Sequence, residues 1–146
     1  MRPKSILLVE DNESDVALTR RALAKGQVDN QLVVAEDGQE ALDYLFGAGN
    51  HAARDLTQQP ALILLDLNLP RVDGLSVLRR IRATPATRRL PVVILTTSLE
   101  AQDLAAAYDA GVNSYLRKPI DFEQFARTIA TLTHYWLGLN ERPPLA

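Results

Sequence analysis

The chain lacks cysteine in all of its 146 residues, which excludes disulfide bonds and thiolate metal sites and suits a reducing compartment. It also lacks a long hydrophobic run. The apolar stretch at residues 6–9 is only four residues long, too short for a signal peptide or a membrane span. Neither sign of charge is in excess, with 16 basic and 18 acidic residues and a net charge of -2. We therefore expect a cytoplasmic protein with neither nucleic acid nor membrane as a partner.

What the chain does contain is a regular alternation of short apolar runs and helical patterns. The runs predict five strands, at residues 5–10, 31–36, 61–66, 91–96 and 113–118. The patterns between them predict five helices, at about 13–25, from Asp37, from Asp73 to near Thr84, from Ser98 to Gly111, and after Asp121. Five strand–helix repeats imply an α/β fold with a doubly wound five-stranded parallel sheet. We expect one domain over residues 1–146, with a core at about 5–137 and a C-terminal tail at 138–146.

Two segments allow two interpretations each. The last helix carries apolar residues three and four apart, which predict a core-facing stripe, although a partner-binding seam would give the same pattern: Phe122, Phe125, Ile129, Leu132 and Trp136. A cluster of arginines favours a solvated basic face over a docking patch: Arg79, Arg80, Arg82, Arg88 and Arg89.

Polar and charged side chains stand where the predicted strands end. They are Glu10, Asp11, Asp66, Thr96 and Lys118. The carboxyl ends of parallel strands meet at one edge of a sheet, so we expect these residues to share a cleft. Carboxylates about 4 Å apart repel by roughly 4 kcal/mol per pair at an effective dielectric near 20, which one lysine does not balance. A Mg²⁺ ion would relieve the repulsion, and so would a proton on one carboxylate.

A magnesium ion beside a carboxylate, a lysine and a hydroxyl is an arrangement suited to phosphoryl groups. The cation and Lys118 would neutralise charge on the phosphoryl oxygens, and Thr96 would donate a hydrogen bond to one of them. Asp66, at the end of the unbroken apolar run 61–65, is then the natural nucleophile and would form an acyl phosphate.

The same residues carry a resemblance to a known family. The segments "LLVEDN", "LILLDLNLPRVDG", "VVILTTS" and "SYLRKP" resemble, in this order, the receiver domain of bacterial two-component response regulators. The segments "VEDNESDVALTRRAL" and "YWL", with the long connection before Asp66, resemble the stand-alone regulators that partner bacterial and cyanobacterial phytochromes. The resemblance implies a flavodoxin-like fold with strand order 2-1-3-4-5.

The resemblance also implies roles for single residues. Asp66 is the phosphoacceptor, and Lys118 pairs with its phosphorylated form. Asp11 and Asp66 bind Mg²⁺ directly together with the backbone carbonyl of Asn68, and Glu10 binds it directly or through water. Thr96 contacts the phosphoryl group and Tyr115 is a switch that follows it, although a packing role fits Tyr115 nearly as well. The Lys118–Pro119 peptide is expected to be cis. Glu10 and Thr97 depart from the family pattern, where aspartate and alanine are commoner.

The function implied is that of a response regulator in a two-component phosphorelay. A sensor histidine kinase, with a bacterial phytochrome as a candidate, would phosphorylate Asp66. The protein would signal by contacts, without an attached output domain, and form a homodimer through the fourth helix, fifth strand and fifth helix. Its own catalysis would be limited to self-phosphorylation and slow autodephosphorylation. The alternative is a small Mg²⁺-dependent phosphatase or phosphotransferase acting on a metabolite, against which Asn68 stands where a second acid would be needed. A nucleotide-binding domain fits poorly, because no glycine-rich loop follows the first strand.

Overall fold

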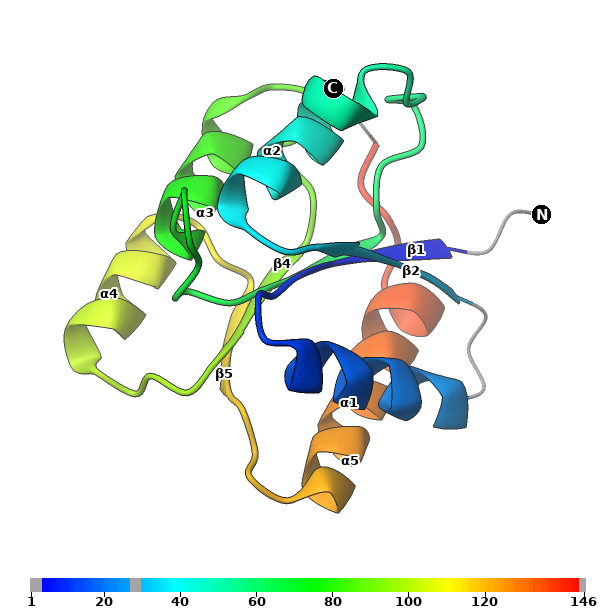
Figure 1. Cartoon of the computed structure of the whole chain (residues 1–146), viewed down its shortest axis with the longest axis vertical. Helices are drawn as coiled ribbons and strands as arrows, with labels where there is room; N and C mark the ends of the chain where they lie inside the picture. The colour runs from blue at the N-terminus through cyan, green and yellow to red at the C-terminus, as the bar shows by residue number, and fades with distance from the viewer. Residues whose placement is uncertain (1–3, 27–29, 145–146) are drawn as a thin grey trace.

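The computed structural model describes residues 4–26 and 30–144, which form a parallel sheet covered by helices on both faces (Figure 1). The strands are β1 (Lys4–Val9), β2 (Asn30–Ala35), β3 (Leu62–Leu65), β4 (Val92–Thr96) and β5 (Ser114–Arg117). Their order is β2-β1-β3-β4-β5, and every pair is parallel. The predicted fold and strand order are confirmed, with strand ends displaced by about one residue.

Five helices connect and follow the strands. They are α1 (Glu13–Lys25), α2 (Gly38–Phe46), α3 (Gly74–Ala83), α4 (Ala101–Asp109) and α5 (Phe122–Thr133), with a 3-10 turn η1 (Gly49–His51) and a π-helical turn η2 (His134–Leu139). Helices α1 and α5 cover one face of the sheet, and α2, α3 and α4 lie on the other (Figure 1). This arrangement leaves the carboxyl ends of the central strands exposed between the two layers, where the candidate site lies.

Short polar side chains begin most of these helices. Asn12, Asp37, Asp73 and Asp121 each accept a hydrogen bond from a backbone N–H in the first turn of the helix that follows. At α2 the Glu40 N–H donates to Asp37 at 2.8 Å, as the capping-box spacing predicts. The Glu40 carboxylate accepts from the Glu36 N–H rather than from that of Asp37, so the reciprocal bond is displaced by one residue.

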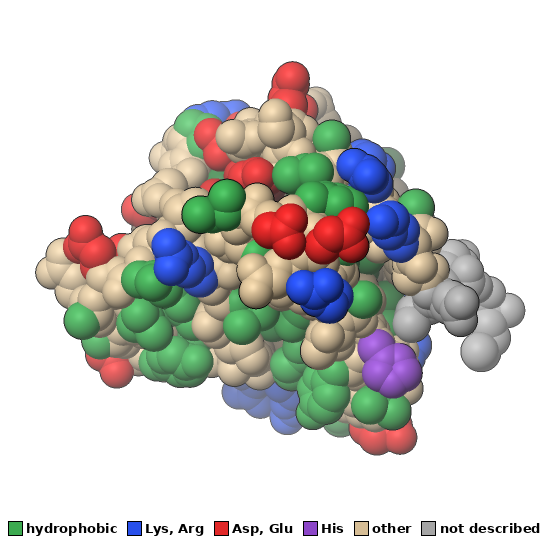
Figure 2. Space-filling view, turned by 90° about the horizontal axis from the view of Figure 1, so that it is seen from below, with side chains coloured by type: hydrophobic (Ala, Val, Ile, Leu, Met, Phe, Trp, Pro, Cys, Tyr) green, Lys and Arg blue, Asp and Glu red, His purple; other side chains and the backbone are tan. Residues whose placement is uncertain are grey.

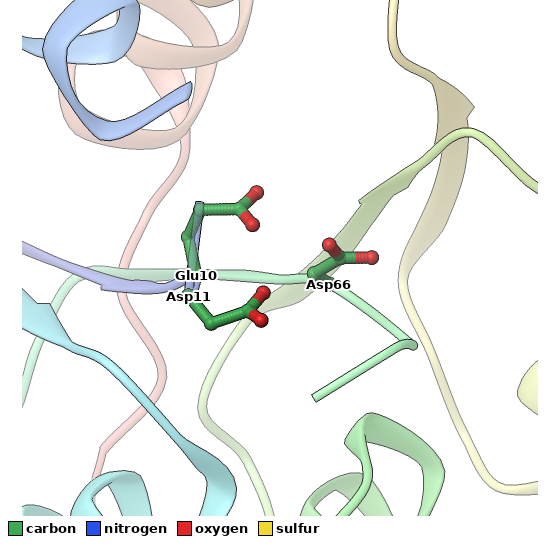
Figure 3. Close-up of side chains that lie close together, drawn as sticks. All are labelled: Glu10, Asp11 and Asp66. Carbon is green, nitrogen blue, oxygen red and sulfur yellow. The ribbon is translucent and has the colours of Figure 1, made fainter. Parts of the chain in front are cut away.

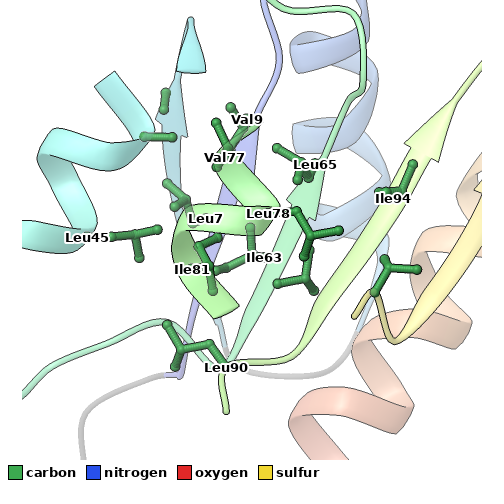
Figure 4. Packing of buried hydrophobic residues seen from close by; sticks show 14 of the residues in the cluster. Leu7, Val9, Leu45, Ile63, Leu65, Val77, Leu78, Ile81, Leu90 and Ile94 are labelled. Atoms are coloured by element: carbon green, nitrogen blue, oxygen red, sulfur yellow. The ribbon is translucent and has the colours of Figure 1, made fainter. Parts of the chain in front are cut away.

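The core has two halves, one on each face of the sheet. Alternate residues of β1 point to opposite faces: Leu7 and Val9 pack toward α2 and α3, and Ile6 and Leu8 toward α1 and α5. Figure 4 shows the first half, in which residues of α2 and α3 meet those of the central strands. Burial on both faces explains the unbroken apolar strand sequences, and each such side chain stabilises the fold by about 1.5–3 kcal/mol.

The apolar stripe of α5 faces the core. Phe125, Ile129 and Leu132 are buried, and Phe122 is half-buried beneath the guanidinium of Arg21 at 4.2 Å. The stripe deviates at its end, where Leu137 rather than Trp136 is the buried residue. The physical reason is η2, whose π-helical turn contains more residues than an α-helical one and rotates the following side chains around the axis.

Two expectations are wrong. Arg82 is not part of a solvated face, because its half-buried guanidinium donates to the carbonyls of Gly111, Arg88 and Leu90 and to Asn113 Oδ1, at 2.7–2.9 Å. The other four arginines of that cluster are exposed. The Lys118–Pro119 peptide is trans, as is every peptide bond in the described residues. Of the predicted tail, residues 145 and 146 lie outside the described residues.

The surface over α1 and α5 mixes both signs of charge. In Figure 2 acidic and basic side chains are interspersed among apolar and neutral ones, as expected for a chain with a net charge of -2. None of the helices in the described residues has the combination of length and apolarity that crossing a bilayer requires.

Candidate metal centre

Backbone pairing brings the predicted site residues to one edge of the sheet. Val9 pairs with Leu65, and the N–H of Asp66 donates to the Val9 carbonyl at 3.1 Å, so Glu10 and Asp66 leave neighbouring strands side by side. The N–H of Lys118 likewise donates to the Thr96 carbonyl at 2.7 Å. The ladder therefore continues into the site and holds its residues in register.

Three carboxylates form the centre of the site. Glu10 and Asp11, at the end of β1, and Asp66, at the end of β3, each place an oxygen within 4.8 Å of the others (Figure 3). Glu10 and Asp66 are buried, and Asp11 is exposed. At such a separation each pair of charges repels by about 3.5 kcal/mol at an effective dielectric of 20. Hard, anionic oxygens converging on one point fit a divalent cation that takes oxygen ligands.

Lys118 supplies the balancing charge within the protein. Its ammonium lies 2.5 Å from Glu10 Oε1, 2.9 Å from Asp15 Oδ2 and 3.2 Å from Asp66 Oδ2, and its side chain is only 10% exposed. Burial acts to lower the pKa of Lys118. The hydrogen bonds to Glu10 and Asp15 and the charge of Asp66 outweigh burial and raise that pKa above its usual range. The ammonium therefore stays charged in the site.

Lys118 offsets the burial of the Glu10 carboxylate only in part. Burial raises the pKa of Glu10 from 4.5 to about 7, although the hydrogen bond and charge of Lys118 act in the opposite direction. Its second oxygen, Oε2, accepts from the Asn12 N–H at 3.3 Å. Burial therefore disfavours the charged form of Glu10 more than the ammonium beside it favours that form. A divalent cation held by the three carboxylates would add positive charge at this point and favour the ionised form.

The loop after β3 is closely packed around Asp66. The Asn68 N–H donates to Asp66 Oδ1 at 3.4 Å, and the Gly74 N–H donates to the Leu67 carbonyl at 3.0 Å. A Cβ at Gly74 would lie 2.1 Å from the Asp66 carbonyl oxygen, so only glycine allows α3 to start this close to the site.

Thr96 and Tyr115 belong to a neighbouring network. Thr96 is fully buried at the end of β4, and its hydroxyl accepts from the Ser98 N–H at 3.4 Å. The Tyr115 hydroxyl donates to the Ser98 carbonyl at 2.9 Å, and Ser98 Oγ donates to Asp103 at 2.6 Å. Tyr115 is also in contact with the core, so its packing and switch interpretations both stay open.

Sequence reasoning missed Asp15. This residue lies in the first turn of α1, four positions after Asp11, and reaches Lys118 from the helix layer rather than from a strand end. A signal was present in the spacing, because a helix that starts directly after β1 directs its first turn past the same edge of the sheet. The strand-end rule considers only residues that terminate strands, and so it passed over this one.

Comparison with known proteins gives consistent matches over the chain. The family model described as "Response regulator receiver domain" matches residues 6–130. The probable methanogenesis regulatory protein FilR2 of Methanothrix harundinacea is 44% identical over 144 residues, covering 97% of this chain and 88% of that protein. Response regulator Rcp1 of Synechocystis is 38% identical over 135 residues, covering 92% of this chain and 90% of Rcp1.

Solved structures agree with these relatives. A crystal structure of the phosphorylated cyanobacterial phytochrome response regulator RcpA has a TM-score of 0.90 and 39% identity, covering 98% of this chain and 100% of that one. A structure of Rcp1 in its Mn²⁺-bound form has a TM-score of 0.89 and 37% identity, covering 97% of this chain and 100% of that one.

Proposed function

The chain belongs to the family of response regulator receiver domains, and from this premise we propose that Asp66 accepts a phosphoryl group from a sensor histidine kinase in a Mg²⁺-dependent reaction. Membership makes the protein a signalling component of a two-component phosphorelay. One observation carries the assignment of the acceptor, which is that the Asp66 carboxylate adjoins both the other two acids and the lysine. It has an oxygen within 4.8 Å of oxygens of Glu10 and Asp11, and its Oδ2 lies 3.2 Å from the Lys118 ammonium.

The phosphoryl transfer forms one bond and breaks one bond. A carboxylate oxygen of Asp66 attacks the phosphorus of the kinase's phosphohistidine, and the phosphorus–nitrogen bond breaks. The imidazole leaves with the electron pair, and Asp66 becomes an acyl phosphate. A small donor such as acetyl phosphate would replace phosphohistidine in the same step, with acetate as the leaving group.

The surrounding residues would stabilise charge during this step. Glu10, Asp11 and Asp66, with the backbone carbonyl of Asn68, would hold Mg²⁺, which when bound neutralises charge on the phosphoryl oxygens. Lys118 would donate to a phosphoryl oxygen from its place beside Asp66. The Thr96 hydroxyl, at the end of β4, would donate a hydrogen bond to a phosphoryl oxygen. The Tyr115–Ser98 hydrogen bond would then respond to the movement of Thr96 toward the phosphoryl group.

The output would pass through protein contacts on the α4–β5–α5 face, which would also form a homodimer. β5 is an edge strand of the sheet, and two apolar side chains, Leu99 just before α4 and Tyr108 on α4, are each 53% exposed. Sedimentation of the protein with and without phosphorylation tests this surface. Tyr108→Ser should weaken self-association, and Leu56→Ser, at an exposed leucine outside the face, should leave it unchanged.

A bacterial phytochrome is the proposed kinase. The similarity to RcpA, a phytochrome response regulator, supports this choice. Phosphoryl transfer from a purified phytochrome kinase that is faster than transfer from an unrelated histidine kinase would support the pairing, and equal rates would contradict it. Membership of the receiver-domain family argues against the alternative of a metabolite phosphatase.

Intact mass after incubation with acetyl phosphate tests the acceptor. Wild type should gain one phosphoryl group with Mg²⁺ and none after chelation, and Asp66→Ala should gain none. Asp109→Ala is a matched control, because it removes an exposed aspartate at the end of α4. Modification of Asp66→Ala at the wild-type rate would overturn the assignment.

A further inference from the structure

The Lys118 ammonium has three N–H donors and three carboxylate partners. Two of these partners, Glu10 and Asp66, also belong to the carboxylate cluster that fits a divalent cation. The third, Asp15, does not belong to that cluster. Asp15 is thus a counter-ion for Lys118 that lies outside the carboxylate cluster.

Binding of a cation sets up a competition in this site. The cation takes up negative charge from Glu10 and Asp66, and its own charge repels the ammonium. Without another partner, Lys118 would compete with the cation for the carboxylates of Glu10 and Asp66. A partner outside the cluster allows both positive charges to occupy one small volume.

The structure holds Asp15 firmly in this place. Its N–H donates to Asn12 Oδ1 at 3.0 Å, and its carbonyl accepts from the hydroxyl of buried Thr19 at 2.8 Å. In the described residues Lys118 is the one side chain that donates to the Asp15 carboxylate. The side chain is 29% exposed, so it is more enclosed than an ordinary surface acid.

We propose that Asp15 is a positioning residue that retains the Lys118 ammonium beside Asp66 when a divalent cation binds, and so allows cation and lysine to act together. The inference rests on the proposed function, because it assigns Lys118 and the cation to the same phosphoryl transfer. An ordinary acidic residue in a first helical turn would instead act only through its charge.

A double-mutant cycle separates the two roles. Mg²⁺ affinity is measured by calorimetry for Asp15→Asn, Asp15→Glu and Glu13→Gln, each alone and combined with Lys118→Met. Glu13 is the matched control, since it is an exposed acid in the same turn of α1. Circular dichroism and melting temperature establish that each variant is folded.

With Lys118 present, Asp15→Asn should weaken Mg²⁺ binding about tenfold, as is usual for loss of a partner that orients a site, and Glu13→Gln should change it less than about twofold. Asp15→Glu should retain most of the affinity. In the Lys118→Met background Asp15→Asn should change affinity no more than Glu13→Gln does, because no ammonium remains to position. An equal loss in both backgrounds would show that Asp15 acts by charge alone, and would overturn the proposal.

A second readout follows the reaction. With saturating Mg²⁺ and acetyl phosphate, Asp15→Asn should lower the initial rate of phosphorylation by about tenfold, and Asp15→Glu should restore most of it. A wild-type protein that takes up no phosphoryl group would contradict the proposed function, but the affinity cycle would still test Asp15. A phosphorylated wild type with an unaltered Asp15→Asn rate and affinity would contradict only the positioning role.

Discussion

Replacing Asp11 by asparagine should change stability in opposite directions with and without Mg²⁺. Asp11 is the exposed member of the carboxylate cluster, and in the described residues no ion pair joins it to a basic side chain. Its charge therefore repels Glu10 and Asp66 without a compensating contact. An asparagine side chain has nearly the same shape as that of aspartate, so Asp11→Asn removes the charge and little else.

The magnitude follows from the separation of the oxygens. At the 4.8 Å limit of the cluster, one pair of charges repels by about 0.9 kcal/mol in water and about 3.5 kcal/mol at an effective dielectric of 20. Because Asp11 is exposed, the aqueous value applies better, and two pairs give about 1–2 kcal/mol. For a chain of this size that gain in stability raises the melting temperature by roughly 3–6 °C.

Mg²⁺ should reverse the ranking. A cation at a hundred times its dissociation constant stabilises the wild type by about 2.7 kcal/mol, which exceeds the advantage of the variant in chelator, and the variant, which lacks one anionic ligand, should gain much less. Thermal melts in chelator and in a Mg²⁺ series measure both effects with one assay. The expected result is a variant that melts above wild type in chelator and shows a smaller shift with Mg²⁺.

Glu141→Gln provides the control, because it removes one exposed carboxylate far from the site. The next residue, Arg142, donates to the carbonyl of Gln59, which precedes β3 and so lies at the opposite edge of the sheet. Glu141→Gln should leave both melting temperature and Mg²⁺ response close to wild type. If Asp11→Asn lowered stability in chelator, or kept the full response to Mg²⁺, the electrostatic account of the site would be refuted.

Three further predictions concern stability in urea. Gly74→Ala should cost about 1–3 kcal/mol and impair Mg²⁺ binding, since its Cβ would meet the Asp66 carbonyl; unchanged stability would contradict the close approach. Arg82→Ala should cost about 2–4 kcal/mol by leaving several acceptors without their donor, whereas exposed Arg79→Ala should stay within about 0.5 kcal/mol. Leu137→Ala should cost about 2–5 kcal/mol and exposed Leu139→Ala far less; the reverse order would refute the π-helical turn.

Local signals were enough to place most of the fold. Apolar runs that are buried on both faces differ from amphipathic helices in their periodicity, so β1, β3 and β4 could be located within about a residue. Helix starts were also predictable, because Asp37 and Asp73 satisfy the backbone donors next to them in the chain. These features depend on neighbours in sequence, and so they can be read without a structure.

The strand-end part of the site was predictable for a related reason. Parallel strands bring their carboxyl ends together, which places Glu10, Asp66 and Lys118 at one edge whatever the details of packing. The partners of Lys118 were only partly predictable. A helix can present its first turn to this edge or away from it, and only the packing of α1 against α5 and the sheet directs Asp15 to the ammonium.

The sequence by itself thus determined the order of elements, the parallel sheet, and the carboxylates and lysine at its edge, because periodicity and strand direction are properties of the chain. The tertiary structure alone decided which side chains form hydrogen bonds or ion pairs with each other, and which are buried. Sequence spacing grouped Arg82 with a solvated cluster, yet it bonds carbonyls from two other segments, residues 88–90 and Gly111. Trp136 fitted the helical stripe and packs against the core, yet Leu137, which the spacing did not select, is the more deeply buried residue of the π-helical turn. Such outcomes depend on distances between segments that are remote in the chain, and no local pattern encodes those distances.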